Sequence, residues 1–325
     1  MPPAGSSSPV GSFEKDYWRS WVSRRSARCR IRSASLNESL HGTASTVRGW
    51  LLLEESGPWG AQVPRDSRLD PLLTQRLHAA SRRLRLRVLL IRRARQATSP
   101  PSSSRQCFLA RTGPGASWIE HVVLDDPANV LDLDLTGFAR GNSLGLDRVT
   151  HPLYLVCTHG RHDVCCAEEG RPVALALATH LPERTWEVSH IGGDRFAANL
   201  LALPHGLYFG RVTPEEVADL ADAYARGEVD PQLFRGRAAY DFATQAAECF
   251  LRTRTGITGV DALPLVGSRR DDEETEAMFG SPEGGCYRVR VRTTAAQPAR
   301  ALTCGAERMS TPCEHRLVYI RHESC

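Results

Sequence analysis

The chain has almost no lysine and no long apolar run. Only Lys15 among its 41 basic residues is a lysine, a bias more typical of a GC-rich genome than of arginine chemistry. No stretch of eighteen apolar residues occurs, so we expect no membrane span. The N-terminus lacks the apolar segment of a secretory signal, so we expect a cytoplasmic protein whose ten cysteines are mostly reduced.

Two function classes find little support in the sequence. The sequence has no pair of carboxylates in a context that indicates glycoside hydrolysis. The arginine-rich stretch RRLRLRVLLIRRAR (82–95) has no interleaved aromatic residues, and its apolar centre is typical of a strand that enters a sheet. Since the net charge is only +4, we expect no nucleic acid among the partners.

The order of predicted elements divides the chain into four parts. Residues 1–11 are rich in Pro, Gly and Ser, and we expect them to be disordered. Residues 12–140 and 146–252 each alternate strands with helices, which is typical of small α/β domains. The strands are expected at 49–55, 87–93, 107–111, 118–124, 153–157, 185–191 and 206–212, and the helices at 70–84, 171–181, 213–227 and 235–252.

The fourth part, residues 253–325, is predicted to be a β-containing extension. YRVRVRTT (287–294) alternates cleanly between polar and apolar residues, and HRLVYI (315–320) is a second strand. We expect the two strands to form a terminal β-hairpin. The charge run SRRDDEETE (268–276) is expected to be a solvated loop or a helix end.

Sulfur and imidazole side chains are concentrated in two short stretches. CTHGRHDVCC (157–166) holds three cysteines and two histidines, and SHIGGDRF (189–196) adds His190 and Asp194. Both stretches follow apolar strands, and sites in open α/β folds are commonly built at the carboxyl ends of strands. We therefore expect the two stretches to form one site.

Four kinds of chemistry use such residues. Thiol–disulfide exchange is the weaker interpretation because the chain has no C-x-x-C motif. Cys157 and Cys166 are nine positions apart, which is too open for a zinc knuckle. Nucleophilic catalysis by a cysteine with a histidine needs only proximity in space, so it stays open. An iron–sulfur cluster needs four ligands on two loops, and Cys157, Cys166, His190 and a residue four positions on would supply them.

The residues also resemble a known family. LYLVCTHGRHDVCC (153–166) and WEVSHIGGDRFAANLLALPHGLYFGRV (186–212), with LHGTASTVRGWLLLEESGPWG (40–60), are similar to the sucrase/ferredoxin-like family. The resemblance runs from about residue 29 to about residue 250, with weaker similarity at 302–306. It implies a thioredoxin-fold 2Fe–2S ferredoxin, in which eukaryotic members hold the cluster with C-x8-C and H-x3-H.

The family pattern assigns most, but not all, of the cluster ligands. Cys157 and Cys166 match the cysteine pair and His190 matches the first histidine, whereas Asp194 stands where the second histidine would be. Asp194 is the preferred fourth ligand by position, Cys165 is the alternative, and an empty site is the third option. The other cysteines are expected to be packing residues or a free terminal thiol: Cys29, Cys107, Cys249, Cys286, Cys304, Cys313 and Cys325. Cys304 and Cys313 repeat the nine-residue spacing and His315 follows, so a second metal site there is the less favoured alternative.

These observations predict an α/β protein. A thioredoxin-like ferredoxin domain follows a second small α/β domain, for which a degenerate thioredoxin-like unit is one option, and a β-containing C-terminal extension completes the chain. The resemblance implies a non-enzymatic one-electron carrier or redox sensor with a 2Fe–2S cluster and an unidentified redox partner protein. A homodimer is an open option. The alternative is a thiol- or zinc-dependent enzyme or binding module on the same fold without an iron–sulfur cluster.

Overall fold

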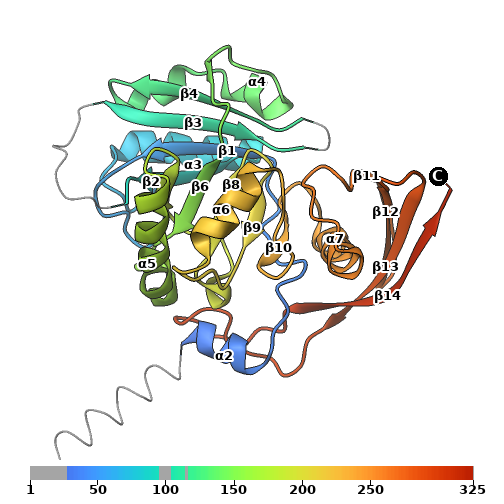
Figure 1. Cartoon of the computed structure of the whole chain (residues 1–325). Coiled ribbons are helices and arrows are strands. Elements are labelled where there is room, and N and C mark those ends of the chain that lie inside the picture. Colours follow the sequence, from blue (N-terminus) through green and yellow to red (C-terminus); the bar gives the residue numbers. More distant parts are fainter. Residues whose placement is uncertain (1–27, 95–103, 114–115, 325) are drawn as a thin grey trace, which may run out of the picture.

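The computed structural model describes residues 28–94, 104–113 and 116–324 (Figure 1). The stretch 1–11, expected to be disordered, and Cys325 lie outside these residues. The described chain is a mixed α/β structure with one large curled sheet and one small sheet. Each helix of the described ranges is too short or too polar to cross a membrane.

Ten strands make the large sheet, in the order β10-β9-β8-β6-β7-β2-β1-β3-β4-β5. Its central strands are continuous apolar runs, and β6 and β8 are buried along their whole length. The strands are β1 (Gly49–Glu54), β2 (Arg87–Arg92), β3 (Arg105–Arg111), β4 (Trp118–Leu124), β5 (Asp147–Arg148), β6 (Leu153–Cys157), β7 (Thr185–Val188), β8 (Leu200–Leu203), β9 (Leu207–Phe209) and β10 (Phe234–Arg237).

The two halves of the large sheet repeat one arrangement of strands. In the first half β1 pairs parallel with β2 and antiparallel with β3, and β3 pairs antiparallel with β4. In the second half β6 pairs parallel with β7 and antiparallel with β8, and β8 pairs antiparallel with β9. The halves meet where β2 pairs antiparallel with β7, through Ile91 opposite Val188 and Arg92 opposite Glu187.

Helices connect the parallel strands of each half. Asp70 begins the helix between β1 and β2 as predicted, because its carboxylate accepts from the Leu72 and Leu73 N–H groups and Pro71 follows at the first helical position. The helices are α2 (Cys29–Ser35), α3 (Pro71–Leu84), α4 (Leu135–Arg140), α5 (Val164–His180), α6 (Val217–Ala225) and α7 (Phe242–Thr255), with short 3-10 helices η1 (Pro127–Asp132) and η2 (Asp194–Phe196).

Three helix predictions need correction, and the helix expected at 213–227 is the shorter α6, Val217–Ala225. The helix expected at 171–181 begins earlier, at Val164, because Asp163 caps it by accepting from the Cys165 N–H group. The helix expected at 235–252 begins only at Phe242, since 234–237 pairs with β9 as strand β10. The earlier start at Val164 matters for function, because it places Cys165 and Cys166 in the first turn of a helix rather than in a loop.

The C-terminal extension is a sheet of four strands rather than a hairpin. The predicted strands are present in β13 (Cys286–Ala295) and β14 (Cys313–Glu323), and β11 (Leu265–Asp271) and β12 (Glu274–Gly280) precede them. The charge run at 268–276 is therefore the β11–β12 hairpin and not a solvated loop or helix end. Cross-strand ion pairs such as Arg288 with Glu276 stabilise this sheet, and its apolar side packs against α7.

Candidate metal centre

The two Cys/His stretches meet at one edge of the large sheet. Cys157 is the last residue of β6, and Cys166 lies in the first turn of α5. His190 follows β7, and Asp194 begins η2. Because β6 and β7 are parallel neighbours, their carboxyl ends bring both stretches to the same place.

The ligand atoms of Cys157, Cys166 and His190 all lie within 4.8 Å of one another. Asp194 is next to them: its Oδ1 lies 2.9 Å from His190 Nδ1 and accepts a hydrogen bond from Cys166 Sγ at 3.3 Å. His162 adds a further nitrogen, 3.8 Å from Asp194 Oδ2. Two triads of potential ligands therefore share His190: one with Cys157 and Cys166, the other with His162 and Asp194.

One buried nitrogen in this group has no hydrogen-bond partner among the described residues. His190 Nδ1 lies 2.9 Å from Asp194 Oδ1 as an ion pair, but it makes no hydrogen bond of good geometry. A buried nitrogen without a partner is costly in an apolar interior. Ligation of a metal ion would satisfy it, and a neutral imidazole nitrogen is a common metal ligand.

The titratable side chains around His190 shift one another's pKa values. The Cys166 thiol lowers the pKa of Cys157 well below its usual value, against the effect of burial and with the help of His190. Burial alone would lower the pKa of His190, but Asp194 and Cys157 raise it to about 9. Asp194 and Cys157 therefore favour the protonated form of His190, and a metal cation bound there would replace that proton.

The neighbouring histidines have different tasks. The ring of His162 stacks on that of His190 with centroids 3.7 Å apart, and the side chain of His162 is 36% exposed. His159 is buried, and both its nitrogens are engaged: Nε2 with the Gly60 carbonyl at 2.8 Å and Nδ1 with the His190 N–H group at 3.2 Å. His159 therefore positions the loop and is not available as a ligand.

A family comparison covers the part of the chain that holds this centre. The model of the sucrase/ferredoxin-like family matches residues 40–236, which include every residue of this centre. The chain belongs to the sucrase/ferredoxin-like family. No solved structure matches it.

Curated relatives of this sucrase/ferredoxin-like protein cover only part of it. "Altered inheritance of mitochondria protein 32" of Debaryomyces hansenii is 33% identical over 95 residues, which are 26% of this chain and 35% of the relative. The protein of the same name from Meyerozyma guilliermondii is 28% identical over 99 residues, 27% of this chain and 35% of the relative. The chain therefore spans about a third of the length of the curated relatives it matches.

A buried arginine that the sequence did not single out holds the ligand loop of this family member. Arg235 donates to the Gly192 carbonyl at 3.0 Å and to Asn199 Oδ1 at 2.7 Å, and Asn199 donates to the Gly193 carbonyl at 2.9 Å. Gly193 has φ +83, and a Cβ there would collide with the Arg235 guanidinium. Arg195, in contrast, turns away and pairs with Glu38.

The structure places the candidate ligands in two groups. Cys157, Cys166, His190 and Asp194 come together in the centre described above. The Sγ of Cys165, the alternative fourth ligand, lies 3.4 Å from Cys304 Sγ, in a second group that also holds Cys29. Cys29 and Cys304 were predicted to be packing residues, but their thiols lie in a group with Cys165 and the carboxylate of Asp163.

Proposed function

We propose that this centre holds a 2Fe–2S cluster and that the protein is a one-electron carrier or redox sensor. The observation that carries the proposal is the meeting of two buried thiols with His190 Nδ1, which makes no hydrogen bond, and the carboxylate of Asp194. Thiolates and imidazole are the ligands of mixed Cys/His iron–sulfur centres. Such a cluster, when bound, supplies a reversible one-electron change.

The donor set fits this group by its chemistry. Cys157 and Cys166 are buried to 1% exposure, which keeps water away from the sulfur atoms. His190 offers a neutral nitrogen once its proton is lost, and Asp194 offers an anionic oxygen in the place of the second histidine of the family pattern. The carboxylate adds a negative charge, so it would favour the oxidised state and lower the reduction potential relative to a Cys2His2 set.

The histidine side of the centre is where we place electron exchange. His190 is 21% exposed and stacks under the more exposed His162, whereas the cysteines are hidden. Both histidines line an open pocket of about 280 Å³, and residues 61–64 and the C-terminal half of α3 lie on its other side. An unidentified redox partner protein would dock there, because a short distance to the cluster favours electron transfer.

The strand order supports a thioredoxin-like fold for each half of the sheet. Each half has a parallel strand–helix–strand unit followed by an antiparallel pair on the outer side of the first strand. On this proposal the second half carries the cluster and the first half is the degenerate copy. We keep the cytoplasm as the proposed location and a non-enzymatic carrier as the proposed class.

Metal and sulfide analysis tests the proposal. Protein purified without oxygen should contain about two irons and two acid-labile sulfides per chain at this centre. Cys157→Ser should lose both, and Cys313→Ser, which removes an exposed free thiol elsewhere, should lose neither. Iron without sulfide, or zinc that Cys157→Ser removes, would instead support the zinc- or thiol-dependent alternative.

A further inference from the structure

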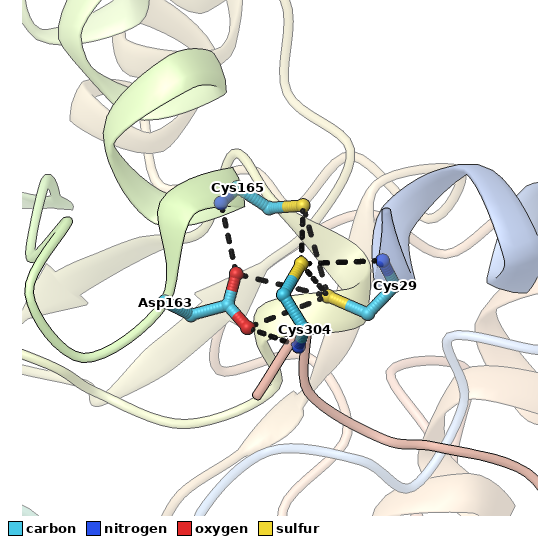
Figure 2. A group of neighbouring side chains, drawn as sticks. All are labelled: Cys29, Asp163, Cys165 and Cys304. Atoms are coloured by element: carbon cyan, nitrogen blue, oxygen red, sulfur yellow. Dashed lines mark hydrogen bonds between the residues drawn. The ribbon is translucent and has the colours of Figure 1, made fainter. Parts of the chain in front are cut away.

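A second group of metal-binding side chains lies outside the candidate centre. It consists of Cys29 at the start of α2, Asp163 and Cys165 at the start of α5, and Cys304 in the segment between β13 and β14 (Figure 2). Cys29 and Cys304 are 275 positions apart and lie outside residues 40–236, which the family model matches. The match to the family model therefore covers neither cysteine.

The distances within this group are those of ligands around one ion. The three sulfur atoms are 3.4, 3.5 and 3.7 Å apart, and both carboxylate oxygens of Asp163 lie 3.7 to 3.8 Å from Cys29 Sγ. Tetrahedral zinc with Zn–S bonds of about 2.3 Å places its sulfur ligands roughly 3.8 Å apart. A disulfide requires about 2.05 Å, and these cysteines are free thiols.

Apolar packing alone does not explain the arrangement. Among the described residues, Ala197 is the one apolar neighbour that joins the three sulfurs in this cluster, and Asp163 places a carboxylate against them at 3% exposure. Asp163 Oδ1 accepts from the Cys165 N–H group at 2.8 Å and Oδ2 from the Cys304 N–H group at 2.6 Å. Each oxygen keeps a second lone pair, so the carboxylate can cap the helix and bind an ion at the same time.

The surrounding contacts hold the three segments in place before any ion binds. Arg300 and Ser310 form a two-way backbone bridge at the base of the loop that presents Cys304. Glu38, just after α2, pairs with Arg300 at 3.0 Å and with Arg195 at 2.7 Å. Figure 1 shows α2 beside this loop, and the Cys29 N–H group contacts Cys304 Sγ at 3.4 Å. The ligands therefore sit on positioned elements rather than on independent loops.

We propose that Cys29, Asp163, Cys165 and Cys304 form a structural zinc site that fastens the N-terminal segment and the C-terminal loop to the first turn of α5. Three thiolates with one carboxylate oxygen suit zinc, whereas calcium and magnesium prefer sets of oxygen ligands. The site neither shares a ligand with the candidate iron–sulfur centre nor depends on its occupancy. It would stabilise the helix turn that also carries Cys166.

The test is metal analysis of the full chain and of matched variants. The wild-type protein should contain about one zinc per chain, and Cys29→Ser and Cys304→Ser should each lose it while iron and sulfide stay unchanged. Cys313→Ser, nine positions after Cys304 and exposed, is the matched control and should keep zinc. Asp163→Asn keeps a helix-capping oxygen and should bind zinc more weakly.

Cobalt gives a readout that does not depend on the variants folding. Metal-free wild-type protein titrated with Co²⁺ should show thiolate-to-metal absorption that zinc removes, and zinc should protect three thiols from alkylation. Zinc that is absent, or that is kept in both cysteine variants, would overturn the proposal. So would a disulfide among these three cysteines in freshly purified protein, or iron that Cys304→Ser removes, since the site would then be a redox pair or an iron site.

Discussion

Cys165 and Cys166 are sequence neighbours whose sulfur atoms belong to different groups. Cys166 Sγ donates to Asp194 Oδ1 at 3.3 Å, and Cys165 Sγ lies 3.4 Å from Cys304 Sγ. Successive side chains of a helix point about 100° apart, so one turn can serve two sites. The first turn of α5 therefore links the candidate iron–sulfur centre to the proposed zinc site through adjacent backbone.

This separation predicts different effects of substitution at Asp194 and Cys165. Asp194→His should retain the cluster and raise its reduction potential on the order of 100 mV, because a neutral ligand replaces an anionic one. Asp194→Ala should leave an open coordination position and a labile cluster. Cys165→Ser should leave iron, sulfide and potential nearly unchanged. Electron paramagnetic resonance and redox titration of the reduced variants measure both properties.

The opposite pattern would reassign the fourth ligand. If Cys165→Ser changed the spectrum and Asp194→Ala did not, Cys165 would be the ligand in the loaded protein. If both variants kept the spectrum and the reduction potential of the wild type, neither residue would be a ligand.

Substitutions of the two stacked histidines should also have different effects on the cluster. His190→Ala should lose the cluster, because His190 Nδ1 is the buried nitrogen without a hydrogen-bond partner within the described part of the chain. His162→Phe keeps a ring stacked on His190 at the more exposed position and should retain iron. Iron content and visible absorbance compare the two variants. Equal loss in both would make His162 a ligand as well.

The sequence predicted that the two Cys/His stretches meet, but not that the second group exists. Cys157, Cys166, His190 and Asp194 follow neighbouring strands, so local order and strand ends bring them together. The contact between Cys29 and Cys304 depends on where the C-terminal loop returns, and no periodicity encodes that. The start of α5 did have a local signal, because Asp163 is a good helix cap before the cysteines.

The prediction of a solvated loop or helix end at 268–276 failed for a second reason. Charged residues in sequence are typical of solvated segments, but here Arg269 pairs in register with Glu276 and Arg270 with Thr275. Asp272 adopts φ 49 at the turn. The strand is stabilised by partners on the neighbouring strand, which a single sequence does not reveal.

Close packing of α5 on β6 predicts a strong effect at Gly170. A Cβ at this position would collide with the carbonyl oxygen of Cys157, and backbone atoms at a strand end cannot give way easily. Gly170→Ala should therefore destabilise the protein by about 2 kcal/mol, despite the better helix propensity of alanine, and displace Cys157 from Cys166. Gly267→Ala, where an added Cβ meets open space, is the matched control. Thermal unfolding and iron content measure both variants, and equal behaviour of the two would contradict the packing argument.

The ion pairs of Glu38 predict a pH-dependent stability. Burial would raise the pKa of Glu38, but Arg195 and Arg300 hold it below its usual value. A carboxyl with a lowered folded-state pKa stabilises the protein above its unfolded pKa, near 4.3, and this contribution is lost as the pH falls through the folded pKa. Glu38→Gln should therefore lower the free energy of unfolding by about 3 kcal/mol at pH 7.

The difference between wild type and Glu38→Gln should shrink as the pH is lowered below about 4.3, since protonated Glu38 resembles glutamine in charge. Urea unfolding of both proteins at pH 7 and over a series of pH values below about 4.3 measures it. Glu276→Gln is the comparison variant, because Glu276 is paired with arginines on the small sheet, away from the proposed zinc site. Only Glu38→Gln should also weaken zinc retention, because Glu38 ties Arg300, at the base of the Cys304 loop, to the segment after α2. Equal zinc retention in the two variants would show that the loop reaches Cys29 and Cys165 without this ion pair.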